Sequence, residues 1–242
     1  MEAQARKELA LLDYPAKDWV IERSFNGAPV GDVLIVGGGQ GGLGVAFGLK
    51  RAKVNNVMVV DQSAPGDEGP WTSVARMETL RTPKHVTGPD LGVPALTPRA
   101  WFEATHGQQA WTDLGKWPVQ DWHDYLQWFK RMAGIPVTSN TRVTAIKPTG
   151  GAGDPLAVDL ESDGGTRTIY VRKIVLATGI EGSGRWYIPE IISGSLPRAR
   201  YHHTSEPIDF AALKGKRIAV LGAGASAFDN AAVALESGAT GT

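Results

Sequence analysis

A run of glycines between two short apolar segments constrains this chain more than any other feature. Residues 32–36, Asp-Val-Leu-Ile-Val, predict a buried strand that leads directly into Gly37-Gly38-Gly39-Gln40-Gly41-Gly42. Residues 43–52 follow with apolar side chains at helical spacing, and residues 57–60 predict a second buried strand that ends at Asp61. Strand, glycine turn, helix and strand together form a βαβ unit of about 30 residues.

The glycine turn fits the pattern G-x-G-x-x-G in two registers. We prefer Gly37, Gly39 and Gly42 to Gly39, Gly41 and Gly44, because the first strand runs straight into Gly37. Glycine at these positions allows a tight turn, close approach of a diphosphate, and tight packing of helix on strand. The amides at the start of the helix face the phosphates, and a terminal acid binds the adenosine ribose. The sequence therefore predicts a dinucleotide site, rather than a purely structural turn, at Gly37, Gly38, Gly39, Gln40, Gly41, Gly42, Asp61 and Gln62.

The same arrangement recurs near the other end of the chain. Residues 217–221 predict an apolar strand, residues 222–227 read Gly-Ala-Gly-Ala-Ser-Ala, and residues 226–236 predict a helix. This repeat predicts a second dinucleotide site at Gly222, Gly224, Ser226 and Ala227. The residue that distinguishes NADPH from NADH is expected about 20 residues after the first glycine. That position is 242, so the choice between the two cofactors stays open.

Composition excludes several classes of protein. The absence of cysteine rules out structural disulfides, thiolate metal sites, iron–sulfur clusters and the redox dithiol of disulfide reductases. Equal numbers of basic and acidic side chains, 25 of each, argue against a nucleic-acid or membrane-surface partner. No apolar run has the length of a signal peptide, and the longest uncharged run, residues 33–49, is too rich in glycine to span a membrane. We therefore expect a cytoplasmic protein.

The middle of the chain combines an aromatic segment with a series of strands. Residues 62–134 hold six of the eight tryptophans, which either fill a core or line a substrate pocket; we favour a core, with Trp71 nearest to any cofactor. Apolar residues between 122 and 132 follow the helical period. Residues 142–146, 156–160 and 166–171 predict strands, with a hairpin turn at 163–165, and residues 174–177 predict another strand.

Together these motifs resemble the class B flavin monooxygenases, which include flavin-containing monooxygenases, N-hydroxylases and Baeyer–Villiger enzymes. The first glycine turn with Asp61 matches the FAD fingerprint of that family, and Gly69-Pro70-Trp71 is similar to its Gly-Gly-x-Trp segment beside the flavin ring. Ala177-Thr178-Gly179 matches its second FAD contact, and the turn at 222–227 matches its NADPH motif. The resemblance covers roughly residues 30 to 238 and puts the main chain of Val143 against the adenine.

The resemblance implies FAD and NADPH (or NADH) as cofactors. NADPH would reduce FAD, and the reduced flavin would trap dioxygen as a hydroperoxide that oxygenates a small molecule. Residues 68–84 are similar to a bacterial subgroup in which some members are assigned as FAD-dependent urate hydroxylases. The sequence identifies no catalytic side chain. Two alternatives stay open: an FAD-dependent NAD(P)H dehydrogenase that passes electrons to a quinone or protein, and an inactive fragment of a flavoprotein.

The segment before the second turn departs from the monooxygenase fingerprint F-x-G-x-x-x-H-x-x-x-[YFW]. Only His202 matches it, because Leu196, Arg198 and Glu206 occupy the other positions. This leaves the monooxygenase subclass and the role of His202 open. Three alternative roles stay open for His202 and His203: a metal pair, a group beside the nicotinamide, or packing residues. We expect no metal, because neighbouring side chains on an extended segment point to opposite faces.

Two further groups of residues have alternative roles. Arg76, Arg81 and Lys84 either neutralise the charge of a cofactor or face solvent. Gly44 and Gly48 each weaken the first helix by about 1 kcal/mol relative to alanine, and close packing of that helix on the sheet would explain them.

The expected architecture is α/β. A Rossmann-like FAD-binding domain, with a parallel sheet and an antiparallel β-meander, precedes the start of a second Rossmann-like NAD(P)-binding domain. The predicted boundaries are an N-terminal extension at 1–30, the FAD-binding domain at 31–190 with its tryptophan-rich insertion at 62–134, a linker at 191–215 and an incomplete NAD(P)-binding domain at 216–242.

A single βα unit cannot surround its own apolar strand with a sheet. We therefore expect exposed apolar surface around residues 218–235, weak FAD binding by this chain alone, and a longer flavoprotein of which this is the N-terminal portion. The oligomeric state stays open.

Overall fold

The computed structural model describes residues 1–180, 182 and 184–241. Its main sheet has the strand order β6-β3-β2-β9-β8-β7, with β1 paired to the start of β2. The strands are β1 (Arg23–Phe25), β2 (Ala28–Val36), β3 (Val57–Val60), β6 (Val137–Thr138), β7 (Arg142–Pro148), β8 (Leu156–Ser162) and β9 (Gly165–Leu176). β6, β3, β2 and β9 run parallel, whereas β9, β8 and β7 form the antiparallel meander. The sheet confirms the predicted α/β class of the first domain.

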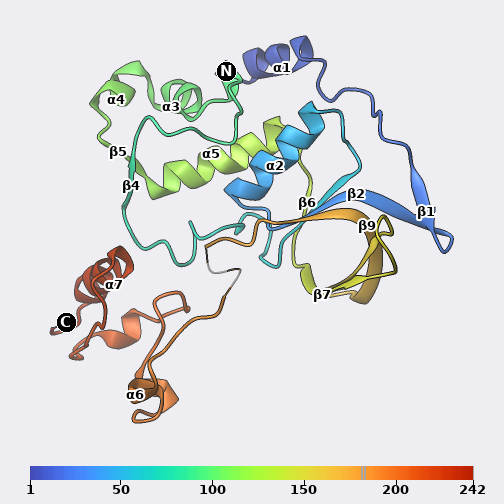
Figure 1. The fold of residues 1–242 in the computed structure, drawn as a ribbon. Helices are drawn as coiled ribbons and strands as arrows, with labels where there is room; N and C mark the ends of the chain where they lie inside the picture. The colour runs from blue at the N-terminus through green and yellow to red at the C-terminus, as the bar shows by residue number, and fades with distance from the viewer. Residues whose placement is uncertain (181, 183, 242) are drawn as a thin grey trace.

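The helices cover one face of the parallel strands (Figure 1). α2 (Gln40–Arg51) connects β2 to β3, and α5 (Val119–Met132) lies beside it, with Phe47 packed edge-on against Phe129. Val33 and Ile35 of β2 point into this helix-covered core, whereas Leu34 joins the opposite core beneath the meander. Alternate β2 residues are therefore buried on both faces, as expected for a central parallel strand.

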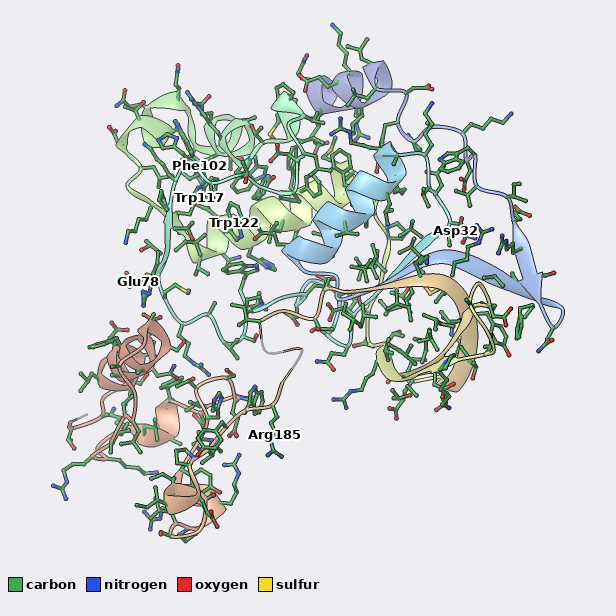
Figure 2. All side chains as sticks on the ribbon, in the orientation of Figure 1. Asp32, Glu78, Phe102, Trp117, Trp122 and Arg185 are labelled. Carbon is green, nitrogen blue, oxygen red and sulfur yellow. The ribbon has the colours of Figure 1, made fainter. Side chains whose placement is uncertain are left out.

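The tryptophan-rich segment forms a compact aromatic core. It contains β4 (Thr79–Pro83), η1 (Pro94–Leu96), α3 (Pro98–His106), α4 (Gln108–Asp113), β5 (Lys116–Pro118) and α5, with β4 and β5 paired antiparallel. Phe102, Trp117 and Trp122 lie close together among these elements (Figure 2). Five tryptophans are almost fully buried: Trp101, Trp111, Trp117, Trp122 and Trp128. This confirms core packing for these five side chains.

The N-terminal residues also pack on this core. α1 (Glu2–Leu11) buries Ala5 and Leu9, and the Glu8 carboxylate accepts a hydrogen bond of 2.8 Å from the Ala95 amide. The Tyr14 hydroxyl donates to the Ala133 carbonyl at 2.6 Å, and burial raises the pKa of Tyr14 to about 12.

One predicted break in the sheet is absent. The strands expected at 166–171 and 174–177 form the single strand β9, which pairs with β8 from Gly165 to Val171 and with β2 from Tyr170 to Leu176. Arg172 lies between the two predicted strands, and its side chain forms an ion pair of 3.1 Å with the buried Asp32. The charge at this position therefore has a partner on the neighbouring strand and does not end β9, although burial still raises the pKa of Asp32.

The C-terminal part lies to one side of the main sheet (Figure 1). It contains α6 (Glu190–Ser193), η2 (Arg198–Arg200), η3 (Ala211–Leu213) and α7 (Ala225–Glu236). The strand predicted at 217–221 is wrong: Arg217 makes one parallel bridge to Gly241, and Ile218 to Leu221 adopt no strand. A parallel strand needs neighbouring strands for its hydrogen bonds, and the described residues provide only this one contact.

Candidate functional site

The edge where three parallel strands end carries the first glycine motif. β2, β3 and β9 end level with one another, since Val36 is aligned with Val60 on one side and Leu176 on the other. Gly37, Asp61 and Ala177 are the next residues along each strand, so the topology brings them together. Ligands of open α/β sheets bind outside this carboxyl edge.

Sterics explain why the turn is built from glycine. Gly37 has φ +113°, and a Cβ on it would lie 2.3 Å from the Ala177 carbonyl oxygen. A Cβ on Gly42 would lie 1.8 Å from the Gly37 oxygen, and one on Gly38 would lie 2.7 Å from Val137. Gly41, by contrast, has nothing within 4 Å. These contacts support the register Gly37, Gly39 and Gly42.

The start of α2 offers free backbone donors. Gly39 precedes the helix without any side-chain cap, and the Leu43 amide, which donates to the Gly39 carbonyl at 2.9 Å, begins the helical bonding. The amides of Gln40, Gly41 and Gly42 therefore remain available at the positive end of the helix dipole, which favours an anion.

Asp61 ties the glycine turn to the end of β3. Its carboxylate accepts hydrogen bonds from the amides of Gly38, at 2.7 Å, and Ser63, at 2.8 Å. A carboxylate has about four acceptor positions, so two remain for a ribose. Gln62 beside it is exposed. The Thr141 amide donates to the Asp61 carbonyl at 2.8 Å, which brings the start of β7, with Val143, near this residue.

The loop at residues 66–71 folds back against the same turn. A Cβ on Gly39 would lie 3.5 Å from the Cα of Gly69, and one on Gly69 would lie 3.5 Å from the indole nitrogen of Trp71. That indole N–H is buried and has no hydrogen-bond partner among the residues that the structure describes. Gly69 and Trp71 were expected here from the sequence. The indoles of Trp122 and Trp128 are also buried and unpaired, so only its position beside Gly69 connects the Trp71 donor with the site.

The group that fixes this loop was missed by sequence reasoning. Glu68 is 3% exposed, and its carboxylate accepts hydrogen bonds from Lys130 at 2.9 Å and Gln127 at 3.2 Å, both on α5. Burial alone would raise the pKa of Glu68, but these hydrogen bonds outweigh it and the pKa is lowered. No local signal reveals such a pair, because its members are 62 residues apart.

Ala177, Thr178 and Gly179 continue from β9 past the turn. The Ala177 amide donates to the Val36 carbonyl at 2.8 Å, and its own carbonyl faces Gly37. Thr178 and Gly179 are exposed, with Gly179 at φ +80°. Val143 lies on β7 opposite Leu160 and packs on the core beneath the meander.

The second glycine turn lies in the C-terminal part, separate from the first. Gly222 has φ +143°, Gly224 caps α7, and a Cβ on Gly222 would lie 3.5 Å from the Ala227 side chain. Gly222, Gly224 and Ser226 are exposed, whereas Ala227 is buried. The predicted cofactor residues therefore lie in two separate groups, one around each glycine turn.

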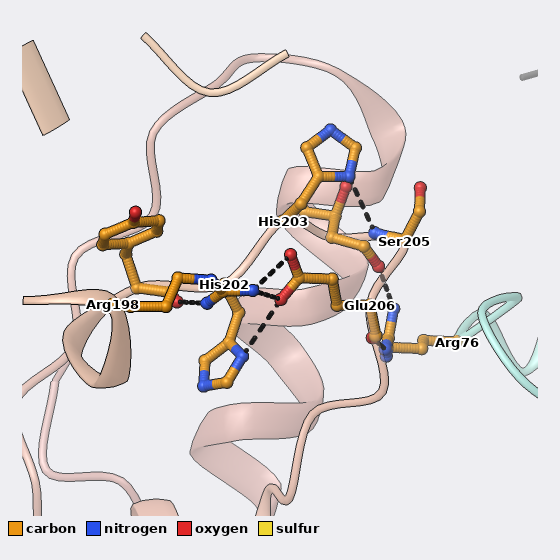
Figure 3. A network of polar contacts seen from close by, with 8 residues as sticks. Arg76, Arg198, His202, His203, Ser205 and Glu206 are labelled. Atoms are coloured by element: carbon orange, nitrogen blue, oxygen red, sulfur yellow. Dashed lines mark hydrogen bonds and ion pairs between the residues drawn. The ribbon is translucent and has the colours of Figure 1, made fainter. Parts of the chain in front are cut away.

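The two histidines have separate partners. The ring of His203 stacks on Trp186, with centroids 5.5 Å apart and planes 8° from parallel. His202 Nδ1 lies 3.4 Å from a carboxylate oxygen of Glu206, which accepts hydrogen bonds of 2.7 Å from Arg198 (Figure 3). The two imidazoles therefore do not converge on a common point.

The three basic residues with alternative roles make other contacts. Lys84 donates to the carbonyls of Trp111, at 2.7 Å, and Thr112, at 3.1 Å, near the end of α4. It borders a cavity of about 230 Å³ whose other charged groups already have partners: Arg99 with Glu103, and Asp90 with backbone amides. Arg76 and Arg81 reach the C-terminal part of the chain.

No helix in the described part of the chain is long and apolar enough to cross a membrane.

Comparison with known proteins gives close relatives in sequence and fold. The chain is 48% identical over 239 residues to a protein named FAD-dependent urate hydroxylase from Xanthomonas campestris pv. campestris, covering 98% of this chain and 50% of that protein. It is 26% identical over 196 residues to an uncharacterized CzcO-like oxidoreductase from Geobacillus kaustophilus, covering 81% of this chain and 49% of that protein. The chain therefore spans about half the length of the curated relatives it matches.

Solved structures share the fold at lower identity. The cadaverine monooxygenase DfoA from Erwinia amylovora, solved with FAD, has a TM-score of 0.65 and 22% identity, over 86% of this chain and 48% of its own. The ornithine hydroxylase PvdA from Pseudomonas aeruginosa has a TM-score of 0.64 and 18% identity, over 83% of this chain and 50% of its own.

A family model covers almost the whole chain. Residues 31–242 match the model for pyridine nucleotide-disulphide oxidoreductases. These 242 residues contain no cysteine, so the family name does not describe a dithiol of this chain. On the extent of this match, the chain belongs to the pyridine nucleotide-disulphide oxidoreductase family.

Proposed function

We propose that this chain binds FAD at the first glycine turn and NADPH or NADH at the second, as part of an NAD(P)H-dependent flavin monooxygenase. One observation carries the proposal: Gly37, Asp61 and Ala177 meet at the carboxyl edge of three level parallel strands, with Gly69 and Trp71 folded against them. This is the position at which open α/β sheets bind dinucleotides.

Three parts of FAD, the diphosphate, the ribose and the adenine, have a fitting group on this chain. The free amides at the start of α2 bind the diphosphate, and the glycine turn leaves room for its close approach. Asp61 orients the ribose, and the main chain at Val143 borders the adenine. The unpaired indole N–H of Trp71 donates to the cofactor, and residues 177–179 close the site from the β9 side.

The flavin supplies the electron transfer and the reaction with dioxygen, and the protein supplies binding and orientation. The second turn, with Gly222, Gly224, Ser226 and Ala227, binds the phosphates of the reducing dinucleotide. We expect the second turn to hold the reducing dinucleotide toward one face of the flavin site, because Arg76 and Arg81 connect the two parts of the chain. The substrates are then a small molecule and dioxygen.

Urate is the first small molecule to test, because a relative 48% identical over 98% of this chain is named FAD-dependent urate hydroxylase. The substrate proposal therefore depends on similarity, whereas the cofactor proposal depends on geometry.

FAD binding is tested first, by titrating purified protein with FAD and following the quenching of tryptophan fluorescence. Trp71→Phe keeps an aromatic ring and removes the unpaired donor, so FAD affinity should fall about fivefold, as for loss of one hydrogen bond. Trp19→Phe is the matched control: Trp19 is 69% exposed and its indole donates to the Ala52 carbonyl, so FAD affinity should not change. No quenching by FAD, or equal affinity of wild type and Trp71→Phe, would count against the proposed site.

Catalysis is tested with FAD-loaded protein and NADPH or NADH in air. Oxygen uptake that increases with urate and yields a hydroxylated product supports the monooxygenase. Electron transfer to a quinone without an oxygenated product would instead indicate the dehydrogenase. The prediction of weak FAD binding is checked by gel filtration: a yellow, monodisperse monomer that retains stoichiometric FAD would contradict it.

A further inference from the structure

Two arginines join the two parts of the chain. We call residues 1–180 the N-terminal unit and residues 190–241 the C-terminal unit. Arg76 and Arg81 reach from one unit to the other through hydrogen bonds, an ion pair and a cation–ring contact. Both arginines belong to the N-terminal unit, where Arg81 lies on β4 and Arg76 precedes it.

Arg76 holds the segment that leads to the second glycine turn (Figure 3). Its guanidinium donates to the carbonyls of Thr204 and Glu206, the latter at 2.7 Å, and lies 5.3 Å from the centre of the Phe210 ring. The Glu206 side chain is itself held by Arg198 at 2.7 Å. Arg76 therefore binds a segment that is already ordered by its own polar contacts.

Arg81 holds the helix of the second glycine turn. Its guanidinium forms an ion pair with Asp229 in the second turn of α7 and lies 3.4 Å from the Ala225 carbonyl, the first residue of that helix. The side chains are 45% and 18% exposed, respectively. Because Ala225 belongs to the turn motif itself, this contact fixes the position of the predicted phosphate-binding amides.

No hydrophobic core supports these polar contacts. The two hydrophobic clusters of the described residues end at Ala177 and at Ile174, and neither includes a side chain of the C-terminal unit. Small, polar interfaces between units allow them to move relative to one another. The orientation of the second turn therefore depends on the two arginines.

We propose that Arg76 and Arg81 are positioning residues that dock the second glycine turn onto the N-terminal unit, with Arg76 as a retained pivot and Arg81–Asp229 as a releasable contact. Arg76 is half-buried and binds uncharged carbonyls, so salt affects it little. The Arg81–Asp229 pair is partly exposed, so salt screens it over a few ångströms at about 1 M. Release of this pair would free α7 while the segment at 204–210 stays attached.

The docking itself is independent of any cofactor, but its consequence for hydride transfer rests on the proposed function. If the second turn delivers the reducing dinucleotide to the flavin, the rate of flavin reduction follows the docked population. Release of α7 would then separate reduction from the later reaction with dioxygen.

Distance measurements test the docking directly. Because the chain has no cysteine, Ala104→Cys on α3 and Ala232→Cys on α7, both exposed, accept spin labels at only these two positions. Pulsed electron–electron double resonance on the cofactor-free chain should give one narrow distribution of the distance between the two spin labels. Arg81→Ala should reduce the ratio of docked to undocked molecules about fivefold, as for a partly exposed ion pair, and Arg76→Ala should reduce that ratio tenfold or more.

Three controls make the result specific. Arg131→Ala removes an exposed arginine of α5 and should leave the distance distribution unchanged. The charge exchange Arg81→Asp with Asp229→Arg should restore the narrow distance that each single change broadens. Raising salt to about 1 M should broaden the wild-type distribution and have little further effect on Arg81→Ala.

Unchanged distributions in both Arg76→Ala and Arg81→Ala would overturn the proposal, and failure of the charge exchange to restore docking would overturn the role of Asp229. Circular dichroism of each variant confirms that it folds. Anaerobic mixing of FAD-loaded variants with NADPH then tests the functional consequence separately. Altered distances with no flavin reduction in the wild type would reject the proposed function and leave the docking proposal standing.

Discussion

Replacing Lys130 by methionine tests the buried ion pair that holds the loop of Gly69 and Trp71. The side chain of Glu68 is 2% exposed and that of Lys130 is 19% exposed, with 2.9 Å between the ammonium and the carboxylate. Gln127 donates to the other carboxylate oxygen at 3.2 Å. Methionine keeps much of the length and apolar character of lysine and removes only the charged donor.

The expected cost follows from what the substitution leaves behind. Removing one partner of a buried ion pair typically costs about 3–5 kcal/mol, because the other charge stays buried. Lys130 is partly exposed and Gln127 remains, so we expect Lys130→Met to lower the free energy of unfolding by less than this typical cost, about 2–3 kcal/mol near pH 7. Glu68→Gln should cost less, about 1–2 kcal/mol, because the lysine can extend toward water.

The pH dependence distinguishes an ion pair from a packing defect. In the wild type, burial raises the pKa of Glu68, but the hydrogen bonds from Lys130 and Gln127 outweigh it and the net shift is downward. A lowered pKa gives stability that is present above the unfolded value of about 4.3 and is lost as the pH falls through the folded value. Without Lys130, burial disfavours the charged form, so the penalty of Lys130→Met should shrink as the pH falls toward about 4.5.

Urea unfolding followed by tryptophan fluorescence measures this penalty, since five buried tryptophans report on the same core. Lys7→Met, at an exposed position of α1, is the matched control and should change stability by less than about 0.5 kcal/mol. A Lys130→Met penalty equal to that of the control, or one that is the same near pH 7 and at about pH 4.5, would refute the ion-pair reasoning.

Gly42→Ala should disrupt the first turn and abolish FAD binding, because the added Cβ would lie 1.8 Å from the Gly37 backbone oxygen. A Cβ on Gly41 has nothing within 4 Å, so Gly41→Ala should keep the fold and gain up to about 1 kcal/mol of helix stability in thermal unfolding. Tyr125→Phe should cost about 1 kcal/mol in urea unfolding, because the buried hydroxyl donates to the Leu96 carbonyl at 3.0 Å; no change would contradict that bond. Since burial raises the pKa of Tyr14 to about 12, its neutral form stabilises the fold below about pH 10, and this contribution should be lost as the pH rises from 10 toward 12; Tyr14→Phe should flatten that part of the stability curve.

Features with a local signal were predictable from the sequence. The strand at 57–60 has the bounds of β3, and the glycine turn, its register and Asp61 lie together as expected. Both follow from patterns within a few residues: apolar runs, and glycines that a Cβ cannot replace. α2 begins three residues before the predicted helix, since its first turn contains two glycines that weaken the helical pattern.

Features that depend on distant partners were not predictable. Close packing of the helix on the sheet was an open explanation for Gly44 and Gly48. A Cβ added to either glycine would instead contact a later loop, at 3.7 Å from Pro89 and 3.3 Å from Leu91, respectively. The sequence gives no sign that this loop crosses α2. The ion pair of Glu68 and the merged strand β9 were missed for the same reason, because each depends on a residue from another element.

Exposure around the second turn agrees with the sequence, but the packing of α7 has a different cause. Leu221, Phe228 and Leu235 are 73%, 69% and 47% exposed, which confirms the expected apolar surface. α7 buries Ala227, Asn230 and Ala234 instead, so its large apolar side chains lie outside, the reverse of the usual amphipathic arrangement. The large apolar side chains of this helix therefore do not set its orientation. Arg81, 148 residues before its partner Asp229, supplies the direct contact that does, and a charge pair at that separation leaves no pattern in the sequence.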